Sequence, residues 1–328
     1  MRVFSDMQAL GALLTSFIVC AALGPVLIPL LHKLKFGQSI REVGPASHRK
    51  KSGTPTMGGI MILIALTVSV LLWDRLTPVV VIALGLTLGH ALIGFTDDYI
   101  KVVKKRNLGL TAKQKFAMQT ALALCYIYYV EIHAGPLATL LWIPGTHLVV
   151  PAGWLYYVLA FFLLVGSTNA VNLTDGLDGL VSCVTLPVMA TYAVIALFAG
   201  EADLSLFAIA VFGSLLGFLV WNHHPAKVFM GDTGSLALGG AVASMALLTH
   251  TELLLVIVGG VYVCEALSVI IQVTYFRHTG GKRIFRMTPV HHHFELGGWK
   301  ETKVVAVFTL ASVVFCALGM LLFLQWGL

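Results

Sequence analysis

Long apolar stretches recur along the whole chain, and they constrain its fold more than any other feature. Of 328 residues, 58% are hydrophobic and only 11% are charged, whereas a soluble domain carries about 25% charged residues. A transmembrane helix needs about 20 mostly apolar residues. Ten stretches approach this length, at residues 10–31, 57–73, 78–96, 116–133, 154–173, 177–199, 204–221, 235–250, 253–276 and 303–325. We therefore predict an all-α, polytopic integral membrane protein with about ten transmembrane helices, folded as a single transmembrane domain over residues 1–328.

The basic residues are distributed unevenly between the two sets of loops that ten spans create. Segments 33–56, 97–115, 222–234 and 277–303 contain 19 Lys and Arg residues, whereas the other side contains only Arg2 and Arg75. Loops rich in Lys and Arg stay in the cytoplasm. This pattern predicts that the four basic segments are cytoplasmic and that both chain ends lie outside.

Residues that carry chemistry gather in the predicted cytoplasmic segments. Asp97 and Asp98 end the third apolar stretch, where carboxylates are costly at membrane depth and where two adjacent ones repel each other. Successive helical residues point in different directions. We therefore expect one carboxylate near a metal ion or its water shell and the other facing a substrate proton. A solvated helix end beside Lys101 and Lys104 is the competing interpretation.

A second polar cluster forms the short turn between the fifth and sixth stretches. Asn169 and Asn172 are three residues apart, as are Asp175 and Asp178, so each pair shares a helix face. Glycines in this turn permit a tight bend and the close approach of a ligand. Asp-Gly is common in ordinary turns, but two Asn and two Asp residues at one membrane boundary favour a function.

A third cluster, residues 221–235, contains Asn222, Phe229 and Asp232. Two interpretations of Asp232 remain open, a helix cap and, between glycines, an oxygen ligand for Mg²⁺. The ring of Phe229 offers a flat face for a base to stack on.

A run of three histidines, His291–His293, lies inside a basic segment. Consecutive residues rarely converge on one zinc ion, so we interpret these histidines as hydrogen-bond donors to phosphate oxygens. Gln272 lies near the inner end of the ninth stretch, where it can reach the same site. Glu265 lies within that stretch and has no assigned role.

The first predicted cytoplasmic loop places Lys51 and Thr56 just before a helix start. Basic residues followed by such a turn suit an anionic ligand, and an ordinary basic anchor at the membrane surface is the alternative.

Together the clusters fit Mg²⁺-assisted phosphoryl transfer, in which positioned charges act on phosphate oxygens. No GxxxxGK[ST] sequence is present, so ATP is not expected as the donor. We expect no nucleic acid partner.

Five segments resemble those of the phospho-N-acetylmuramoyl-pentapeptide transferase family, in the family's order along nearly the whole chain. They are Lys51–Gly59, Asp97–Lys101, Asn169–Gly179, Phe229–Asp232 and Pro289–Glu295. The aspartates also resemble the wider superfamily of polyprenyl-phosphate N-acetylhexosamine-1-phosphate transferases. The resemblance implies a dimeric ten-helix transferase of the bacterial inner (plasma) membrane, with periplasmic termini and a cytoplasmic active site.

The resemblance also implies the reaction. It implies Mg²⁺ as cofactor, UDP-MurNAc-pentapeptide and undecaprenyl phosphate as substrates, and lipid I plus UMP as products, in the first membrane step of peptidoglycan synthesis. Asp232 is then the main Mg²⁺ ligand with Asn172 as a second one, and Asp97, Asp98 and His291 complete the catalytic set. The substrate-binding residues that the resemblance implies are Lys51, Lys101, Lys113, Asn172, Asp175, Gly176, Leu177, Asp178, Asn222, Phe229, His291 and His292.

The mechanism and the function each have alternatives. We expect Asp97 to deprotonate or orient the lipid phosphate, which attacks the donor in a single displacement; in the competing scheme an Asp attacks first. The nearest functional alternative is a sibling enzyme that loads GlcNAc-1-phosphate onto the same lipid. A cation-coupled transporter using Asp97, Asp98 and Glu265 is less favoured, because most acidic residues lie at one membrane edge. A structural scaffold leaves the polar clusters without a role.

Overall fold

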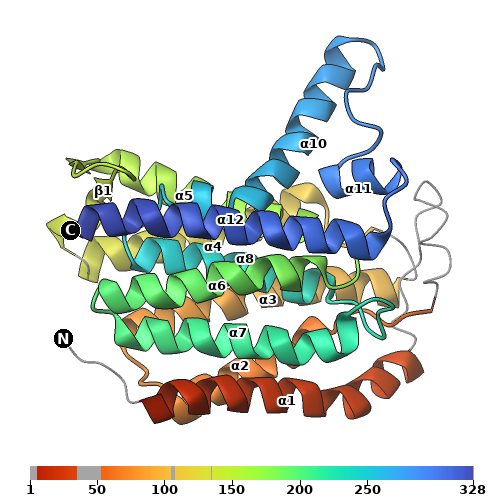
Figure 1. Cartoon of the computed structure of the whole chain (residues 1–328), viewed down its shortest axis with the longest axis horizontal. Helices are drawn as coiled ribbons and strands as arrows, with labels where there is room; N and C mark the ends of the chain where they lie inside the picture. Colours follow the sequence, from red (N-terminus) through yellow and green to blue (C-terminus); the bar gives the residue numbers. More distant parts are fainter. Residues whose placement is uncertain (1–5, 35–52, 105–107, 134, 328) are drawn as a thin grey trace.

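The structure is a computed structural model that describes residues 6–34, 53–104, 108–133 and 135–327, and it is mostly helical (Figure 1). Its long helices are α1 (Asp6–Lys33), α2 (Gly59–Trp73), α3 (Pro78–Val103), α4 (Ala112–His133), α5 (Trp154–Thr174), α6 (Leu180–Phe198), α7 (Ala202–Asn222), α8 (Gly231–Leu248), α10 (Gly260–His278) and α12 (Glu301–Gly327). Shorter elements are the 3₁₀ helix η2 (Pro136–Thr139), the antiparallel strands β1 (Leu140–Trp142) and β2 (Val149–Pro151), and the helical turns α9 (Leu255–Val258) and α11 (Val290–Glu295).

Among the described residues, six helices are long and apolar enough to cross a membrane, namely α1, α3, α5, α6, α7 and α12. α2 is also apolar but has only 15 residues. Each of the ten predicted stretches overlaps one of the long helices. The predicted class, a helical multi-pass membrane protein, is therefore confirmed, while the number of spans and their orientation stay predictions.

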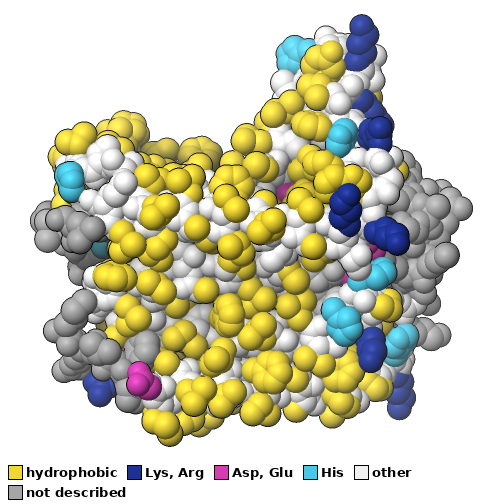
Figure 2. Space-filling view, viewed as in Figure 1, with side chains coloured by type: hydrophobic (Ala, Val, Ile, Leu, Met, Phe, Trp, Pro, Cys, Tyr) yellow, Lys and Arg dark blue, Asp and Glu magenta, His cyan; other side chains and the backbone are white. Residues whose placement is uncertain are grey.

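The surface of the bundle fits a protein embedded in lipid. Hydrophobic side chains cover its flank, whereas most Lys, Arg and His side chains gather at one end and along the projecting α10 (Figure 2). Exposed apolar residues on the flank include Leu14, Leu92 and Val314. α1 begins and α12 ends at the same end of the bundle (Figure 1), which agrees with chain ends on one side.

α8 lies in the centre of the bundle and fixes the position of its neighbours. Every residue from Thr233 to Leu247 is buried. Small residues let α3 and α5 approach it closely, because a Cβ on Gly94 would lie 2.0 Å from the Asp232 carbonyl oxygen and one on Gly239 would lie 2.4 Å from Thr168 Cα. The first turn of α8 is therefore held tightly between α3 and α5.

The ninth predicted stretch, 253–276, is not one continuous helix. It is broken at Gly259 into α9 and α10, and α10 then projects out of the bundle (Figure 1). Glycine is a poor helix former, and a Cβ on Gly260 would lie 2.7 Å from the Phe315 ring. Gly259 thus ends α9, and Gly260 leaves room for the Phe315 ring of α12 at the same point.

Candidate active site

Three carboxylates from two helices meet at one end of the bundle. Asp97 and Asp98 lie near the end of α3 and are buried, and Asp232 lies in the first turn of α8. One oxygen from each carboxylate lies within 4.8 Å of the others. The close contact of Gly94 with the backbone of Asp232 brings these side chains together.

Two lysines hold the three carboxylates together. Lys101 Nζ lies 2.6 Å from Asp97 Oδ2 and 3.2 Å from Asp232 Oδ2. Lys115 Nζ lies 2.8 Å from Asp232 Oδ2 and 3.7 Å from Asp97 Oδ1. These five residues form the lysine-bridged cluster, in which two ammonium groups face three carboxylates.

Lys115 is a site residue that the sequence analysis did not identify. The predicted residue was Lys113, which is exposed, whereas Lys115 contacts Asp232. Residues two apart on a helix point about 200° apart, so only one of the two can face α8. The helix register alone decides which, and no local sequence signal reveals it. A role for Lys113 stays a prediction.

Asp97 and Asp98 have different partners, as their helical spacing predicts. Asp98 Oδ2 accepts hydrogen bonds from the backbone N–H (2.9 Å) and the hydroxyl (2.8 Å) of Thr233. Asp97 Oδ1 accepts one from the Leu110 backbone N–H at 2.8 Å. Asp98 therefore caps one of the unpaired N–H groups of α8. Asp97 lies near both lysines, and Lys101 Nζ also lies 3.7 Å from Asp98 Oδ1.

The buried Thr56 lies beside this cap. Gly231 has a φ of 74°, and a Cβ there would lie 2.6 Å from Asp98 Oδ2 and 2.8 Å from Thr56 Oγ1. Glycine therefore adopts this backbone conformation without strain, and its lack of a side chain avoids a clash with Asp98 and Thr56.

Asn172 reaches the cluster from α5. Its amide nitrogen donates to Asp232 Oδ1 at 3.0 Å and to Ser235 Oγ at 2.8 Å. In this arrangement Asn172 orients the Asp232 carboxylate. Ligation of an ion by the amide oxygen of Asn172 requires the amide group to turn over, so its role as a ligand stays a prediction.

The turn between α5 and α6 connects the carboxylates to the histidines. Burial and then the charges of Asp232, Asp98 and Asp178 raise the pKa of the Asp175 carboxyl. Next to it, a Cβ on Gly176 would lie 2.1 Å from His291 Nε2. The predicted aspartates and His291 thus belong to one continuous site.

The three consecutive histidines have three different partners. His291 Nδ1 lies 2.9 Å from Glu265 Oε1 and His292 Nδ1 lies 2.8 Å from Glu295 Oε2. His293 Nδ1 accepts a hydrogen bond from the Arg286 backbone N–H at 3.1 Å. The three Nδ1 atoms therefore contact three separate groups.

Gln272 anchors the segment that returns from α10 to α11. Its Oε1 accepts hydrogen bonds from the backbone N–H groups of Ile284 and Phe285, both at 3.0 Å. This contact helps to place α11, and with it His291, against the bundle. These hydrogen bonds do not involve a substrate, so the predicted contact of Gln272 with substrate stays a prediction.

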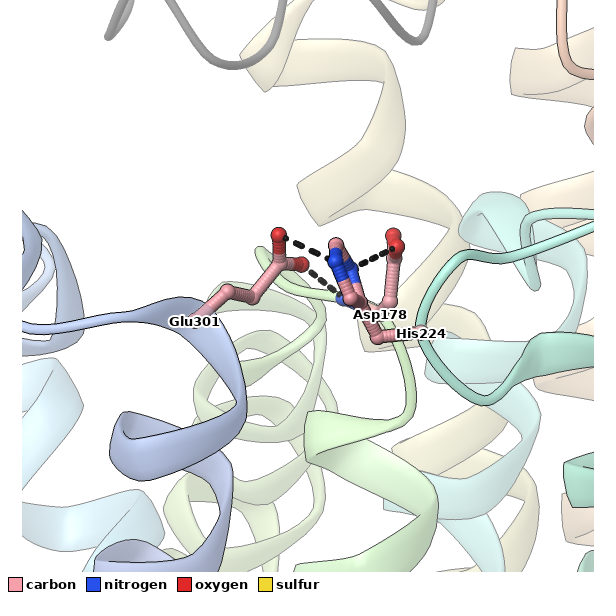
Figure 3. A group of neighbouring side chains, drawn as sticks. All are labelled: Asp178, His224 and Glu301. Atoms are coloured by element: carbon pink, nitrogen blue, oxygen red, sulfur yellow. Dashed lines mark hydrogen bonds and ion pairs between the residues drawn. The ribbon is translucent and has the colours of Figure 1, made fainter.

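Asp178, His224 and Glu301 form a second group, the histidine-bridged cluster, from three separate segments (Figure 3). His224 Nδ1 lies 2.9 Å from Asp178 Oδ2 and 3.3 Å from Glu301 Oε2. Glu301 Oε1 accepts a hydrogen bond from the Asp178 backbone N–H at 2.7 Å, and Asp178 Oδ2 accepts one from the Ala226 N–H at 3.1 Å. The cluster ties the turn after α5 to the loop after α7 and to the start of α12.

Asn222 and Phe229 stabilise the same loop. Asn222 accepts a hydrogen bond from the Gly179 N–H at 3.1 Å and donates to the Val228 carbonyl at 2.9 Å. The Phe229 N–H donates to the Pro55 carbonyl at 2.8 Å, which joins this loop to the segment before α2. Phe229 is half-buried and Leu177 is buried. Lys51 lies outside the described residues.

Two family descriptions match segments of the chain. The family described as Glycosyl transferase family 4 matches residues 80–250, which include all three carboxylates of the lysine-bridged cluster. Residues 51–63 match the Phospho-N-acetylmuramoyl-pentapeptide-transferase signature 1.

Two curated relatives cover almost the full chain. A phospho-N-acetylmuramoyl-pentapeptide-transferase of Bacillus subtilis (strain 168) is 53% identical over 314 residues, which are 94% of this chain and 96% of the relative. One of Geobacillus sp. (strain WCH70) is 54% identical over 312 residues, 94% of this chain and 95% of the relative. The fold and site define a membrane-embedded transferase of the glycosyl transferase family 4 class. Within it, the chain belongs to the phospho-N-acetylmuramoyl-pentapeptide-transferase family.

The lysine-bridged cluster has the donor set of a metal site. Asp97, Asp98 and Asp232 offer carboxylate oxygens close enough to share one ion, and such hard ligands suit a divalent cation. The histidine-bridged cluster also brings its ligand atoms together, but it offers two carboxylates and an imidazole, whereas a hard cation such as Mg²⁺ prefers oxygen ligands. The lysine-bridged cluster is therefore the better candidate metal centre.

Proposed function

We propose that this protein transfers phospho-MurNAc-pentapeptide from UDP-MurNAc-pentapeptide to undecaprenyl phosphate, giving lipid I and UMP. The names of the relatives and the signature at residues 51–63 favour this reaction over transfer of GlcNAc-1-phosphate. The structural observation that carries the proposal is the lysine-bridged cluster at the end of a membrane bundle. Phosphoryl transfer depends mainly on such positioned charges.

The proposed reaction exchanges one diphosphate linkage for another. A phosphate oxygen of the lipid attacks the β-phosphorus of the donor, and the bond from that phosphorus to the oxygen of the α-phosphate breaks. UMP leaves with the electron pair of the broken bond. No separate energy source is needed because one phosphoanhydride bond forms as another is lost.

The residues of the lysine-bridged cluster divide this work. Asp232 holds Mg²⁺, with Asp97 and Asp98 near the ion. When bound, Mg²⁺ neutralises negative charge on the diphosphate oxygens. Lys101 and Lys115 offer ammonium groups to phosphate oxygens. Asp97, which faces both lysines, orients the lipid phosphate or accepts its proton.

The remaining predicted residues surround the donor. Phe229 stacks on the uracil, while the turn after α5 and the loop containing Asn222 enclose the nucleoside. His291 and His292 face the phosphates or the muramoyl group. The hydrogen bonds that join these loops support a preformed nucleoside site.

The same proposal places the protein in the bacterial inner membrane, with its catalytic loops in the cytoplasm and both termini in the periplasm. The 19-to-2 division of Lys and Arg residues supports this orientation, and the common end of the bundle at which α1 begins and α12 ends agrees with it. We further propose a homodimer with a single transmembrane domain per chain.

An assay with purified components tests the reaction. UMP release is measured with UDP-MurNAc-pentapeptide, undecaprenyl phosphate and Mg²⁺, with each component omitted in turn and with UDP-GlcNAc as the competing donor. We expect release only from the complete mixture with the muramoyl donor. Equal rates with UDP-GlcNAc would reject the substrate assignment, and no release by folded protein would reject the reaction.

A rapid-quench experiment separates the two mechanisms. Labelled donor is mixed with protein and Mg²⁺ in the absence of lipid. We expect no labelled protein, and a trapped phospho-enzyme would overturn the single displacement.

A further inference from the structure

Glu265 is a carboxylate inside an otherwise apolar part of α10, and it is fully buried. Its Oε1 lies 2.9 Å from His291 Nδ1, and both side chains have 0% exposure. A buried carboxylate is costly unless it is paired and hydrogen-bonded. Its partner, His291, belongs to α11 and lies 26 positions further along the chain.

The contact with Glu265 leaves the other ring nitrogen of His291 available. Nε2 is buried and has no hydrogen-bond partner among the described residues. It faces the backbone of Gly176, where an added Cβ would lie only 2.1 Å away. Gly176 follows Asp175, whose carboxyl is within electrostatic reach of Asp232 and Asp98. The unsatisfied nitrogen is therefore directed towards the turn that borders the lysine-bridged cluster.

We propose that Glu265 is a positioning residue that fixes the orientation and tautomer of His291 for the transfer reaction. As an acceptor for Nδ1–H, the Glu265 oxygen holds the hydrogen on Nδ1 and leaves Nε2 for the phosphate-bearing part of the donor. A carboxylate behind a functional histidine commonly sets its tautomer in this way. The inference rests on the proposed function, because it assigns His291 to that same site.

Two substitutions separate the hydrogen bond of Glu265 from its charge. Glu265→Gln keeps an oxygen that accepts from Nδ1–H but removes the charge, whereas Glu265→Met removes both. We expect kcat to fall about 10-fold in the first variant and about 100-fold in the second, the range found when a supporting hydrogen-bond partner is lost. KM for the UDP-linked donor should change by less than roughly threefold in both.

A double-variant cycle tests whether Glu265 acts through His291. In a His291→Gln background, adding Glu265→Met should lower kcat by no more than about twofold, because the residue it positions is already gone. Full additivity of the two effects would overturn the proposal and indicate an independent structural role.

A spectroscopic measurement tests the same idea without any turnover. In protein labelled with ¹⁵N-histidine, the His291 signals are assigned from the spectrum of His291→Gln. We expect a protonated Nδ1 in the wild type and in Glu265→Gln, and its loss in Glu265→Met. Glu295→Gln is the matched control, since it alters the neighbouring His292–Glu295 pair and should leave the hydrogen on His291 Nδ1.

The two experiments fail in distinguishable ways. An absence of UMP release by the wild type would remove the proposed function but would leave the tautomer measurement intact. A His291 ring with its hydrogen on Nε2 alone, or one unaffected by Glu265→Met, would overturn the positioning role even in a fully active transferase.

Discussion

The lysine-bridged and histidine-bridged clusters compensate their buried carboxylates in different ways. In the first, three carboxylates face two lysines. In the second, two carboxylates share one histidine whose side chain is 41% exposed, and backbone N–H groups complete their hydrogen bonds. The first cluster thus offers three carboxylates and two ammonium groups, whereas the second offers two carboxylates joined by one imidazole.

This difference indicates different roles for two groups that look alike as sets of ligand atoms. Three carboxylates bridged by two lysine side chains are suited to take up a divalent cation and a diphosphate, since the lysines can turn to the phosphate oxygens. A histidine between two carboxylates with backbone support is suited to join three segments. We therefore expect substitutions in the lysine-bridged cluster to affect turnover, and those in the histidine-bridged cluster to affect substrate affinity.

The largest expected effect is that of Asp232→Ala. It removes the carboxylate that both lysines and Asn172 contact, so turnover should fall at least about 100-fold, as when a key electrostatic group is removed from an active site. UMP release is measured over a Mg²⁺ titration, and Asp203→Ala, an acidic position in the first turn of α7, serves as the matched control. Normal Mg²⁺-dependent activity in a folded Asp232→Ala protein would exclude Asp232 as the metal ligand.

The next largest effect concerns the choice between two nearby lysines. Lys115→Met removes an ammonium group 2.8 Å from Asp232, and turnover should fall by about 10-fold or more, the loss expected for a charge-assisted contact. Lys113→Met, which alters an exposed position on the same helix, should cost less. Initial rates at saturating donor give the comparison. A greater loss in Lys113→Met would show that the register of α4 differs when substrate is bound.

These examples show which features of the site a sequence can predict. The helices follow from hydropathy, because the bilayer imposes a fixed length on apolar segments. The positions of Asp97 and Asp232 at helix ends follow from the same pattern. The different directions of the adjacent Asp97 and Asp98 side chains, about 100° apart, follow from helix geometry alone. Lys115 and the pairing of Glu265 with His291 depend on contacts between helices far apart in the chain. Such contacts have no local pattern and emerge only from packing.

The histidine-bridged cluster should respond more weakly and in another parameter. His224→Ala removes the group between Asp178 and Glu301, so the turn after α5 is held less firmly. We expect KM for the UDP-linked donor to rise about threefold to tenfold, an effect of about 1 kcal/mol, while kcat changes little. Steady-state kinetics separates the two parameters. A loss confined to kcat would place His224 in the chemistry and remove the distinction between the clusters.

The smallest expected effect lies at Asp175, which is electrostatically coupled to both clusters. Burial and neighbouring carboxylates raise its pKa in the folded protein above the usual 3.8. Below that value the carboxyl is neutral in both the folded and the unfolded protein, so it does not oppose folding. Stability is lost as the pH rises through the raised folded pKa. Asp175→Asn has no carboxyl to ionise, and it should unfold roughly 2 °C higher than the wild type at pH 8 without Mg²⁺. Thermal unfolding in detergent from pH 5 to 8 measures the difference, which should shrink towards low pH. A difference that is constant with pH would show that the charge on Asp175 is not what opposes folding, and that the carboxylates of the two clusters do not act on it.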